Sequence, residues 1–310
     1  MKIIDAHVHL VQCIAGTGAG GEMRAAGGGL GRYADGTTFS LIPPELGETD
    51  VTPETVLRVM DEHHVEKAVL LQGNFLGFQN LYSYEAQRRW PERFLAAAAY
   101  DPFSRNVEGI RRHLFEELGI RVVKFEVSTG SGLMANHPTL PLDGELMEAE
   151  YAYADEQDLV FVIDIGKMGS ESSQIPALRR AIQRHAGMKF VVCHLLAPNA
   201  SQKADMCAGL EALALPNVWF DLASLQHNLR PDEPPYPRTR HFLRCAADLV
   251  GSERLLFGSD LPSTLCRHRY ADLIDCIAGC GDFSEQEKQC ILHDNAETVF
   301  FSHSGAGPVR

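Results

Sequence analysis

Two histidines near the start of the chain, His7 and His9, have the types and spacing that point most directly to chemistry. They lie in the short apolar run Lys2–Leu10, whose composition predicts a β-strand. Because successive side chains of a strand point to opposite faces, both imidazoles should project from one face, about 7 Å apart along the strand. Two imidazoles at one strand end suit a divalent metal that prefers nitrogen ligands, zinc before all others.

Other apolar runs of the sequence also end in polar side chains. Lys124 and Glu126 end one of them and should share a face by the same alternation. Later runs bring further candidates for a site, which are Asp164, His194, Asp221, Ser224 and Asp260. A polar group at the end of an apolar strand is costly to bury without a partner, so several such groups favour a common site.

Each candidate also has a structural interpretation. The histidines could be hydrogen-bonded core residues, and Asp260 could cap the turn at Leu261-Pro262. We expect Asp221 to cap a strand or bind backbone, outside the central site. Cys193, which neighbours His194, should point to the opposite face of its strand, toward the surrounding helices.

The elements that must position these groups alternate along the chain. The expected strands are Ile3–Val8, Lys67–Gln72, Phe94–Tyr100, Arg121–Glu126, Val160–Ile165, Lys189–His194, Val218–Leu222 and Arg254–Gly258. Helical stretches should begin near Pro53, Leu81, Arg105, Leu142, Gln174, Ser201, Arg238 and Arg267, and a last helix near Asn295–Phe301 should follow. Eight apolar strands, each followed by a helix, predict an α/β fold, a single (β/α)₈ barrel over residues 1–310. A doubly wound open sheet is the alternative, and in the barrel the C-terminal strand ends carry the catalytic groups.

Two irregular connections should lie over these strand ends. The first runs from Val11 to Val51, is rich in glycine from Gly16 to Gly36, and distorts the barrel pattern. It leaves the same strand end as His7 and His9, so we expect it to cover the site. Its segment Gly16–Gly21 matches a dinucleotide-binding pattern formally, but no helix opens there, which favours a flexible loop. The second connection, Gln226–Pro237, contains four prolines.

Composition limits the partners of the chain. With 28 Lys and Arg against 41 Asp and Glu, the 310 residues carry a formal net charge of −13, which argues against nucleic acid or an anionic membrane as the main partner. No apolar run approaches the roughly 20 residues of a membrane span. The chain enters a strand at once, so we expect no secretory signal. Its eight cysteines contain no Cys-x-x-Cys pair, so we expect reduced thiols and a cytoplasmic protein. A small-molecule substrate and a homodimer are the expected partners.

Taken together, these segments resemble the amidohydrolase superfamily. The matching stretches are Asp5–His9, Val191–His194, Asn217–Asp221 and Arg254–Pro262, with Asn295-Ala296 in the last helix. More narrowly, they look like amidohydrolase family 2, metal-dependent hydrolases with the TIM-barrel fold, and the resemblance covers nearly the whole chain. The resemblance implies a divalent metal, zinc or alternatively manganese, on His7, His9, His194 and Asp260.

The chain departs from that family pattern at strand five, where Asp164 stands in place of a histidine. A carboxylate can ligate zinc or manganese, so Asp164 could be a further ligand. Alternatively Asp164 binds water or substrate and the metal is weak or absent, as in the similar pyrone-dicarboxylate lactonases. In two-metal relatives a strand-four lysine is carbamylated and bridges the ions; Lys124 or Glu126 could do so. We favour a Lys124 that neutralises carboxylates or binds an anionic substrate.

The leading functional hypothesis is hydrolysis of a small carbonyl compound, a lactone or an amide, by a metal-activated water. Asp260 would accept the proton of this water, His194 would ligate the metal or stabilise the oxyanion, and Lys124 would act beside them. A second hypothesis is a non-oxidative decarboxylase or hydratase, in which Lys124 and Arg267 bind a carboxylate. A third is a catalytically silent ligand-binding barrel.

Overall fold

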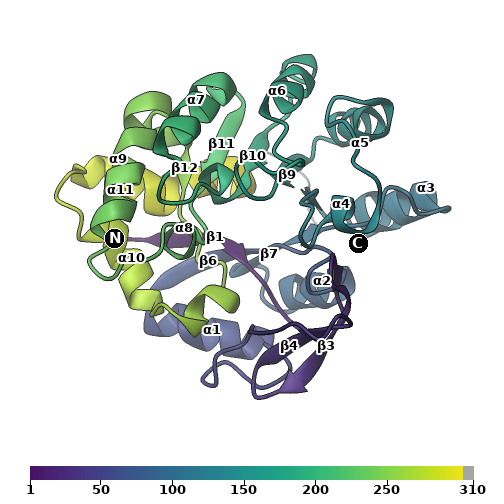
Figure 1. Ribbon diagram of the computed structural model, residues 1–310, viewed down its shortest axis with the longest axis horizontal. Coiled ribbons are helices and arrows are strands. Elements are labelled where there is room, and N and C mark those ends of the chain that lie inside the picture. Colours follow the sequence, from purple (N-terminus) through teal and green to yellow (C-terminus); the bar gives the residue numbers. More distant parts are fainter. Residues whose placement is uncertain (303–310) are drawn as a thin grey trace.

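Eight parallel strands form a nearly closed barrel with helices between them, in a computed structural model that describes residues 1–302 (Figure 1). Each strand pairs with the next one around the barrel. In this order they are β1 (Ile3–Val8), β6 (Val65–Leu70), β7 (Phe94–Ala98), β8 (Val122–Glu126), β9 (Val160–Asp164), β10 (Phe190–Val192), β11 (Val218–Asp221) and β12 (Leu255–Leu256). The predicted (β/α)₈ barrel is therefore confirmed, and the open sheet is excluded.

The barrel closes between its first and last strands. The Ala6 amide donates to the Phe257 carbonyl at 2.8 Å, and the Asp260 amide donates to the His7 carbonyl at 2.9 Å. Val8 and Leu261 continue this pairing as a parallel bridge. The closure brings a segment near residue 260 beside the first strand, although some 250 residues separate them in the sequence.

Helices follow the strands and begin within a few residues of the expected positions. They are α1 (Pro53–Glu62), α2 (Asn80–Arg89), α3 (Val107–Arg111), α4 (Leu133–Asn136), α5 (Glu145–Glu156), α6 (Ile175–Arg184), α7 (Lys203–Leu213), α8 (Leu225–Asn228), α9 (Pro237–Val250), α10 (Tyr270–Ala278) and α11 (Glu285–Gln289). Short helical turns are η1 (Arg112–Glu117), η2 (Cys193–Leu196), η3 (Ser252–Arg254), η4 (Ser263–Cys266), η5 (Cys290–Asp294) and η6 (Glu297–Phe301). None of the helices within residues 1–302 combines the length and apolar character needed to cross a bilayer.

Local sequence explains these elements. In α1, the Thr52 hydroxyl caps the helix by accepting from the Thr55 amide, and Pro53 occupies the first turn, where its missing N–H costs nothing. Val56 and Met60 of this helix are fully buried, because apolar residues four apart share one helix face. This face packs α1 on the barrel and leaves the strand ends free for the site.

Two apolar layers hold the barrel together. The inner layer fills the barrel with side chains that include Ile4, Ala6, Val69, Leu71, Ala97, Val122, Val160, Val162, Val191, Cys193 and Leu256. The outer layer lies between strands and helices and contains most of the larger apolar side chains. Because the inner layer is packed below the strand ends, the polar residues of the site sit on a solid apolar floor.

The long first connection is folded, contrary to the expected flexible loop. Residues Thr17–Ser40 form a four-stranded antiparallel sheet of β2 (Thr17–Gly18), β3 (Gly21–Gly27), β4 (Leu30–Tyr33) and β5 (Thr38–Ser40) (Figure 1). Val11 and Val51 exchange two backbone hydrogen bonds, of 3.1 and 2.7 Å, at the base of the connection. Gly16–Gly21 leads into these strands and not into a helix, so the dinucleotide pattern has no structural basis here.

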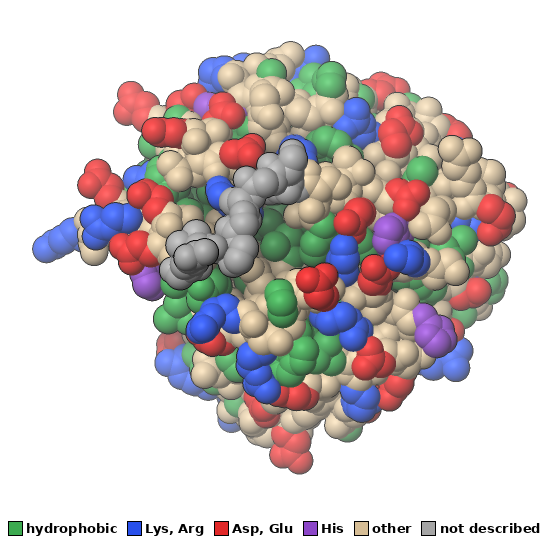
Figure 2. Space-filling model, turned by 180° about the vertical axis from the view of Figure 1, so that it is seen from behind, with side chains coloured by type: hydrophobic (Ala, Val, Ile, Leu, Met, Phe, Trp, Pro, Cys, Tyr) green, Lys and Arg blue, Asp and Glu red, His purple; other side chains and the backbone are tan. Residues whose placement is uncertain are grey.

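Charged side chains of both signs are intermingled on the face shown in Figure 2. Acidic and basic groups alternate over this face, and neither sign forms a continuous area. Such a face offers no extended basic surface of the kind that nucleic-acid backbones require.

Candidate active site

Three electron-pair donor atoms lie close together at the mouth of the barrel, where the first and last strands pair. His7 Nε2 lies 3.2 Å from His9 Nε2, and His9 Nε2 lies 3.1 Å from Asp260 Oδ1. The third side of this triangle, from His7 Nε2 to Asp260 Oδ1, is 3.7 Å. The expected convergence of the first strand's histidine pair with the late aspartate is present, with His7 fully buried and the other two side chains 14% exposed.

The outer nitrogens of both rings bind acceptors, and this fixes the tautomers. His9 Nδ1 donates to the Leu71 carbonyl at 2.9 Å, and His7 Nδ1 donates to Asp221 Oδ2 at 3.1 Å. Burial lowers the pKa of His7 to about 4, so its ring is neutral. The two Nε2 atoms therefore direct lone pairs at each other and at a carboxylate oxygen.

Three electron-pair donors at this separation repel one another unless a cation lies between them. Bonds of about 2.0–2.2 Å from nitrogen and carboxylate oxygen to zinc correspond to tetrahedral ligand spacings of about 3.3 Å, close to the observed triangle. The outer hydrogen bonds to Leu71 and Asp221 are the usual support of metal-binding histidines. The donor set of His7, His9 and Asp260 thus fits a divalent metal. His7, His194 and Asp221 form a second group with donor atoms within 4.8 Å.

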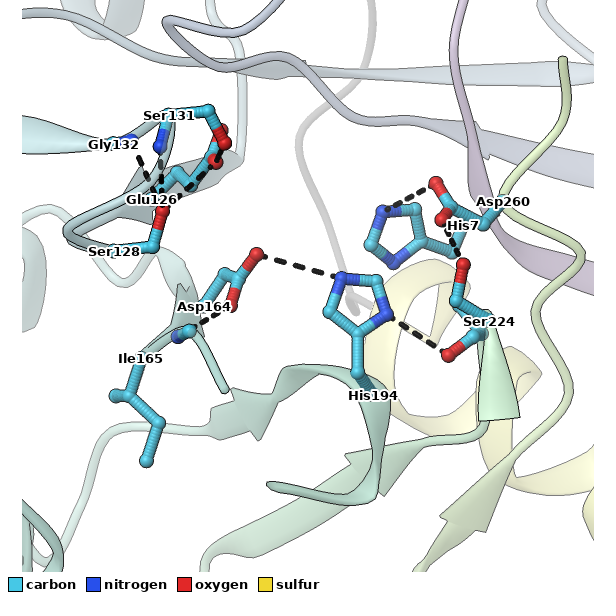
Figure 3. A network of polar contacts seen from close by, with 12 residues as sticks. His7, Glu126, Ser128, Ser131, Gly132, Asp164, Ile165, His194, Ser224 and Asp260 are labelled. Carbon is cyan, nitrogen blue, oxygen red and sulfur yellow. Dashed lines mark hydrogen bonds and ion pairs between the residues drawn. The ribbon is translucent and has the colours of Figure 1, made fainter. Parts of the chain in front are cut away.

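His194 and Asp164 form an ion pair beside this triangle (Figure 3). His194 Nε2 lies 3.4 Å from Asp164 Oδ2, while His194 Nδ1 donates to the Ala223 carbonyl at 2.9 Å. Burial opposes charge on both groups, but their mutual attraction outweighs it, raising the pKa of His194 to about 10 and lowering that of Asp164 to about 2. Asp164 therefore points at His194 and lies outside the triangle of His7, His9 and Asp260.

Left-handed backbone brings several of these side chains to the barrel mouth. Val191 and Cys193 both face the barrel interior, so the expectation that Cys193 points toward the helices is wrong. Strict alternation would then turn His194 outward, but β10 ends at Val192 and His194 adopts φ = 60°, which redirects its side chain inward. Asp260 (φ = 57°) and Ser224 (φ = 58°) are also left-handed. Such conformations are costly for residues with a Cβ and cluster at functional sites.

The first strand has its own irregularity. Ile4 and Ala6 belong to the inner apolar layer, so regular alternation would place His7 on the outer face. The pairing of β1 with β6 shifts register between Asp5 and Val8, where the strand turns His7 to the mouth. The shared site of His7 and His9 therefore depends on this irregularity as well as on their spacing.

Asp221 was expected outside the central site, yet it contacts the His7 ring and the backbone of His194. Its Oδ2 accepts from His7 Nδ1, and its Oδ1 accepts from the His194 amide at 2.9 Å and the Ala223 amide at 3.1 Å. These backbone contacts agree with the predicted capping role. The contact with His7 could be found in the sequence only by placing Asp221 at a strand end beside the strand of His194.

Lys124 is buried at the mouth without a protein partner. Its side chain is 3% exposed and makes no hydrogen bond or ion pair with residues 1–302. Burial favours the neutral amine, but the surrounding acidic groups, Glu126 and Asp164 among them, raise the pKa of Lys124 above its ordinary value. The ammonium group is therefore available to a ligand in the cavity.

A cavity of about 180 Å³ connects these groups. Its polar wall contains His7, His9, Lys124, Glu126, Ser131, Asp164, His194 and Asp260. Its apolar wall contains Leu41, Phe75, Leu76 and Pro262. Leu41 belongs to the long first connection, which confirms that this connection covers the site, whereas Arg267 is exposed and does not line the cavity. A wider opening of about 360 Å³ adjoins it and reaches Asn228 of the second connection.

A family model described as "Amidohydrolase" matches residues 4–301, whereas no curated protein matches the chain. Solved structures with the same fold include a probable 2-pyrone-4,6-dicarboxylic acid hydrolase from Acinetobacter baumannii, 18% identical, covering 97% of this chain and 99% of that one with a TM-score of 0.70. An amidohydrolase from Burkholderia multivorans with bound zinc is 16% identical, with coverages of 97% and 99% and a TM-score of 0.70. A 2,6-dihydroxybenzoate decarboxylase from Rhizobium is 16% identical, with coverages of 80% and 87% and a TM-score of 0.58.

Proposed function

The chain belongs to the amidohydrolase family and is an enzyme of the hydrolase type, and from its site we propose that it hydrolyses a small carbonyl compound, a lactone or an amide. The observation that carries this proposal is the triangle of His7, His9 and Asp260, in which three electron-pair donors face one point. The cavity of about 180 Å³ is suited to a small substrate.

His7, His9 and Asp260 would hold a divalent metal, and we propose zinc first and manganese second. When bound, the metal would act as a Lewis acid that polarises a carbonyl and lowers the pKa of water from 15.7 toward about 7. The solved zinc-containing relative supports this assignment.

Asp260 is the proposed general base. The positive charge of His194 nearby helps to outweigh the effect of burial and to hold the pKa of Asp260 far below its usual range, so it is ionised. Its Oδ2 accepts a hydrogen bond from the Ser224 hydroxyl, which fixes the carboxylate. Asp260 takes one proton from the attacking water as the water oxygen bonds to the carbonyl carbon. It returns this proton to the leaving oxygen or nitrogen as the bond from that atom to the carbonyl carbon breaks.

Lys124 and His194 are the proposed electrostatic partners of the carbonyl oxygen. Both are cations that line the cavity, and Lys124 has no competing protein partner within residues 1–302. Negative charge that develops on the carbonyl oxygen would be stabilised by the Lys124 ammonium group. His194 stays paired with Asp164, and we assign it to this electrostatic role before a role as metal ligand.

Replacing the base tests the proposal. The Asp260→Asn variant should lower kcat for lactone hydrolysis about 10²- to 10⁴-fold, because the amide cannot accept the proton. The measurement is hydrolysis of a lactone panel by zinc-loaded protein. The exposed Asp205→Asn variant on α7 is the matched control and should keep the wild-type rate. A rate of Asp260→Asn within a few-fold of wild type would refute the role of Asp260.

Decarboxylation of a small carboxylic acid is the second candidate, because an unpaired buried ammonium such as Lys124 also suits a substrate carboxylate. A solved decarboxylase shares the fold. Carbon dioxide release during turnover of aromatic or unsaturated acids would favour this reaction, and acid release from lactones without carbon dioxide would favour hydrolysis.

A further inference from the structure

Glu126 ends β8 at the mouth of the barrel and faces the cavity. It is directly opposite Asp164, the last residue of β9, in the register of these two strands, and each side chain is 9% exposed. Glu126 lines both the inner cavity and the wider opening beside it. The mechanism proposed above does not use this carboxyl group.

The segment after β8 folds around one oxygen of Glu126 (Figure 3). Glu126 Oε1 accepts from the Ser131 hydroxyl at 2.6 Å and from the Ser128 hydroxyl at 3.2 Å. Ser128 Oγ accepts in turn from the Gly132 amide at 3.0 Å and the Ser131 amide at 3.2 Å, so its only proton goes to Glu126. The carboxyl is therefore fixed through Oε1, and Oε2 has no donor within residues 1–302.

Lys124 provides a second, independent observation at the same place. It shares a strand face with Glu126, two residues earlier, and lines the same cavity. It is almost fully buried and has no hydrogen-bond or ion-pair partner in the described part of the chain. Within the described part of the chain, Lys124 and Glu126 make no direct ion pair. Both residues thus line one cavity, where Glu126 Oε2 is a free acceptor and Lys124 Nζ a free donor within residues 1–302.

The hydrogen-bonding properties of Glu126 and Lys124 determine which substituent of a substrate they could bind together. A carboxylate only accepts hydrogen bonds, so it could bind Lys124 but would leave Glu126 Oε2 without a donor. An ammonium group only donates and would be repelled by Lys124. A hydroxyl group both donates and accepts, so it satisfies Glu126 and Lys124 together.

We propose that Glu126 and Lys124 form a subsite for a hydroxyl group on the carbon next to the reacting carbonyl, so that the enzyme prefers neutral α-hydroxy lactones to carboxylated ones. This rests on the proposed hydrolase function. The position next to the carbonyl follows from the small size of the cavity, because Lys124, Glu126 and the triangle of His7, His9 and Asp260 all line the same space of about 180 Å³.

The test compares two lactones that differ in one group. Zinc-loaded wild type should hydrolyse α-hydroxy-γ-butyrolactone with a kcat/KM at least about tenfold above that for γ-butyrolactone, the range expected for a hydrogen bond to a charged group. It should act poorly on 2-pyrone-4,6-dicarboxylate. Equal kcat/KM values for the two butyrolactones, or preference for the dicarboxylate, would overturn the subsite while leaving hydrolysis intact.

The Glu126→Gln variant sharpens the test. Ser128 and Ser131 would keep the amide oxygen, so the amide NH₂ would face the cavity beside Lys124. The preference for the hydroxylated lactone should fall to about twofold or less, and carboxylated lactones should bind better than they do to wild type. Glu108→Gln, an exposed substitution in α3, is the matched control and should keep the wild-type preference.

Calorimetric binding of the corresponding lactams, with and without the α-hydroxyl group, separates the two proposals because it does not require turnover. Tighter binding of the hydroxylated lactam by wild type, and no such difference in Glu126→Gln, supports the subsite even if no lactone is hydrolysed. Absence of lactone hydrolysis, with the lactam preference present, would overturn the hydrolase proposal alone. Equal binding of both lactams by wild type would overturn the subsite.

Discussion

At the scale of single residues, the site depends on carboxylates that orient imidazoles. Asp221 is fully buried, and its Oδ2 holds His7 Nδ1 while its Oδ1 holds the backbone of His194. Hydrogen bonds from His7 Nδ1 and the His194 amide, together with the positive charge of His194, outweigh burial and keep the pKa of Asp221 far below its ordinary value. Its charge and both of its oxygens are therefore committed to positioning, and it does not face the cavity.

Replacing Asp221 should weaken metal binding more than it changes the fold. In Asp221→Asn the amide NH₂ could face His7 Nδ1 and favour the wrong tautomer, so the affinity for zinc should fall about 10- to 100-fold. Competition with a chromogenic chelator measures this affinity, and circular dichroism checks the fold. An Asp221→Asn variant that binds zinc as tightly as wild type would show that Asp221 does not orient His7.

At the scale of elements, the short helix α11 is fixed by a capping box at its N-terminus. In α11, Ser284 Oγ accepts from the Glu287 amide at 3.3 Å, and Glu287 Oε2 accepts from the Ser284 amide at 2.8 Å. Arg244 of α9 adds a hydrogen bond to Glu287 Oε1 at 2.8 Å. This capping box joins α11 to α9 through a single carboxylate.

The capping box predicts how stability depends on pH. Hydrogen bonds from Ser284, aided by Arg244, lower the pKa of Glu287 to about 2 from an ordinary value of 4.5. Between these values the unfolded chain binds the proton and the folded chain does not, so stability is lost as pH falls from 4.5 toward 2.

Glu287→Gln should therefore lower the free energy of unfolding by about 1 kcal/mol at pH 7. The difference from wild type should shrink when urea denaturation is repeated at pH 3. Asp205→Asn, which removes one exposed carboxylate from α7, is a control for the loss of a negative charge alone. A difference that is unchanged at pH 3 would contradict the role of the ionised carboxylate.

At the scale of the whole molecule, the site joins the first and last strands of the barrel. His7 and His9 lie on or just after β1, whereas Asp260 follows β12, and hydrogen bonds from the backbone and to the Asp5 carboxylate close the barrel there. A metal held by these three side chains would link the two edges. Metal binding should therefore stabilise the complete fold and not only the site.

Removal of metal should lower the melting temperature. A ligand at 100 times its Kd stabilises the folded state by about 2.7 kcal/mol, which corresponds to roughly 5 °C or more for a chain of this size. Differential scanning calorimetry of zinc-loaded protein and of protein treated with a chelator measures the shift. The His9→Asn variant is the control, and its melting temperature should change little on treatment with the chelator. An unchanged melting temperature of the wild type would contradict a tightly held metal.

The sequence by itself determined the barrel and most of the candidate residues. Eight apolar runs with intervening helical patterns predict the topology, because hydrophobic periodicity is a local property that each segment carries alone. The positions of His7, His9, His194 and Asp260 at strand ends follow from this topology. The glycine-rich connection was misjudged, because composition reports flexibility of the unfolded chain and not the strand pairing within Thr17–Ser40.

Only the tertiary structure decided how the side chains are arranged at the mouth. Cys193 follows the alternation set by Val191 and faces the interior, and the same alternation would send His194 outward. The left-handed backbone of His194 turns its side chain to the mouth instead, and Asp260 is also left-handed. The contact between Asp221 and His7, and the pairing of Asp164 with His194, join residues from different strands. Such contacts arise from barrel closure and the packing of neighbouring strands, which no local pattern in the chain encodes.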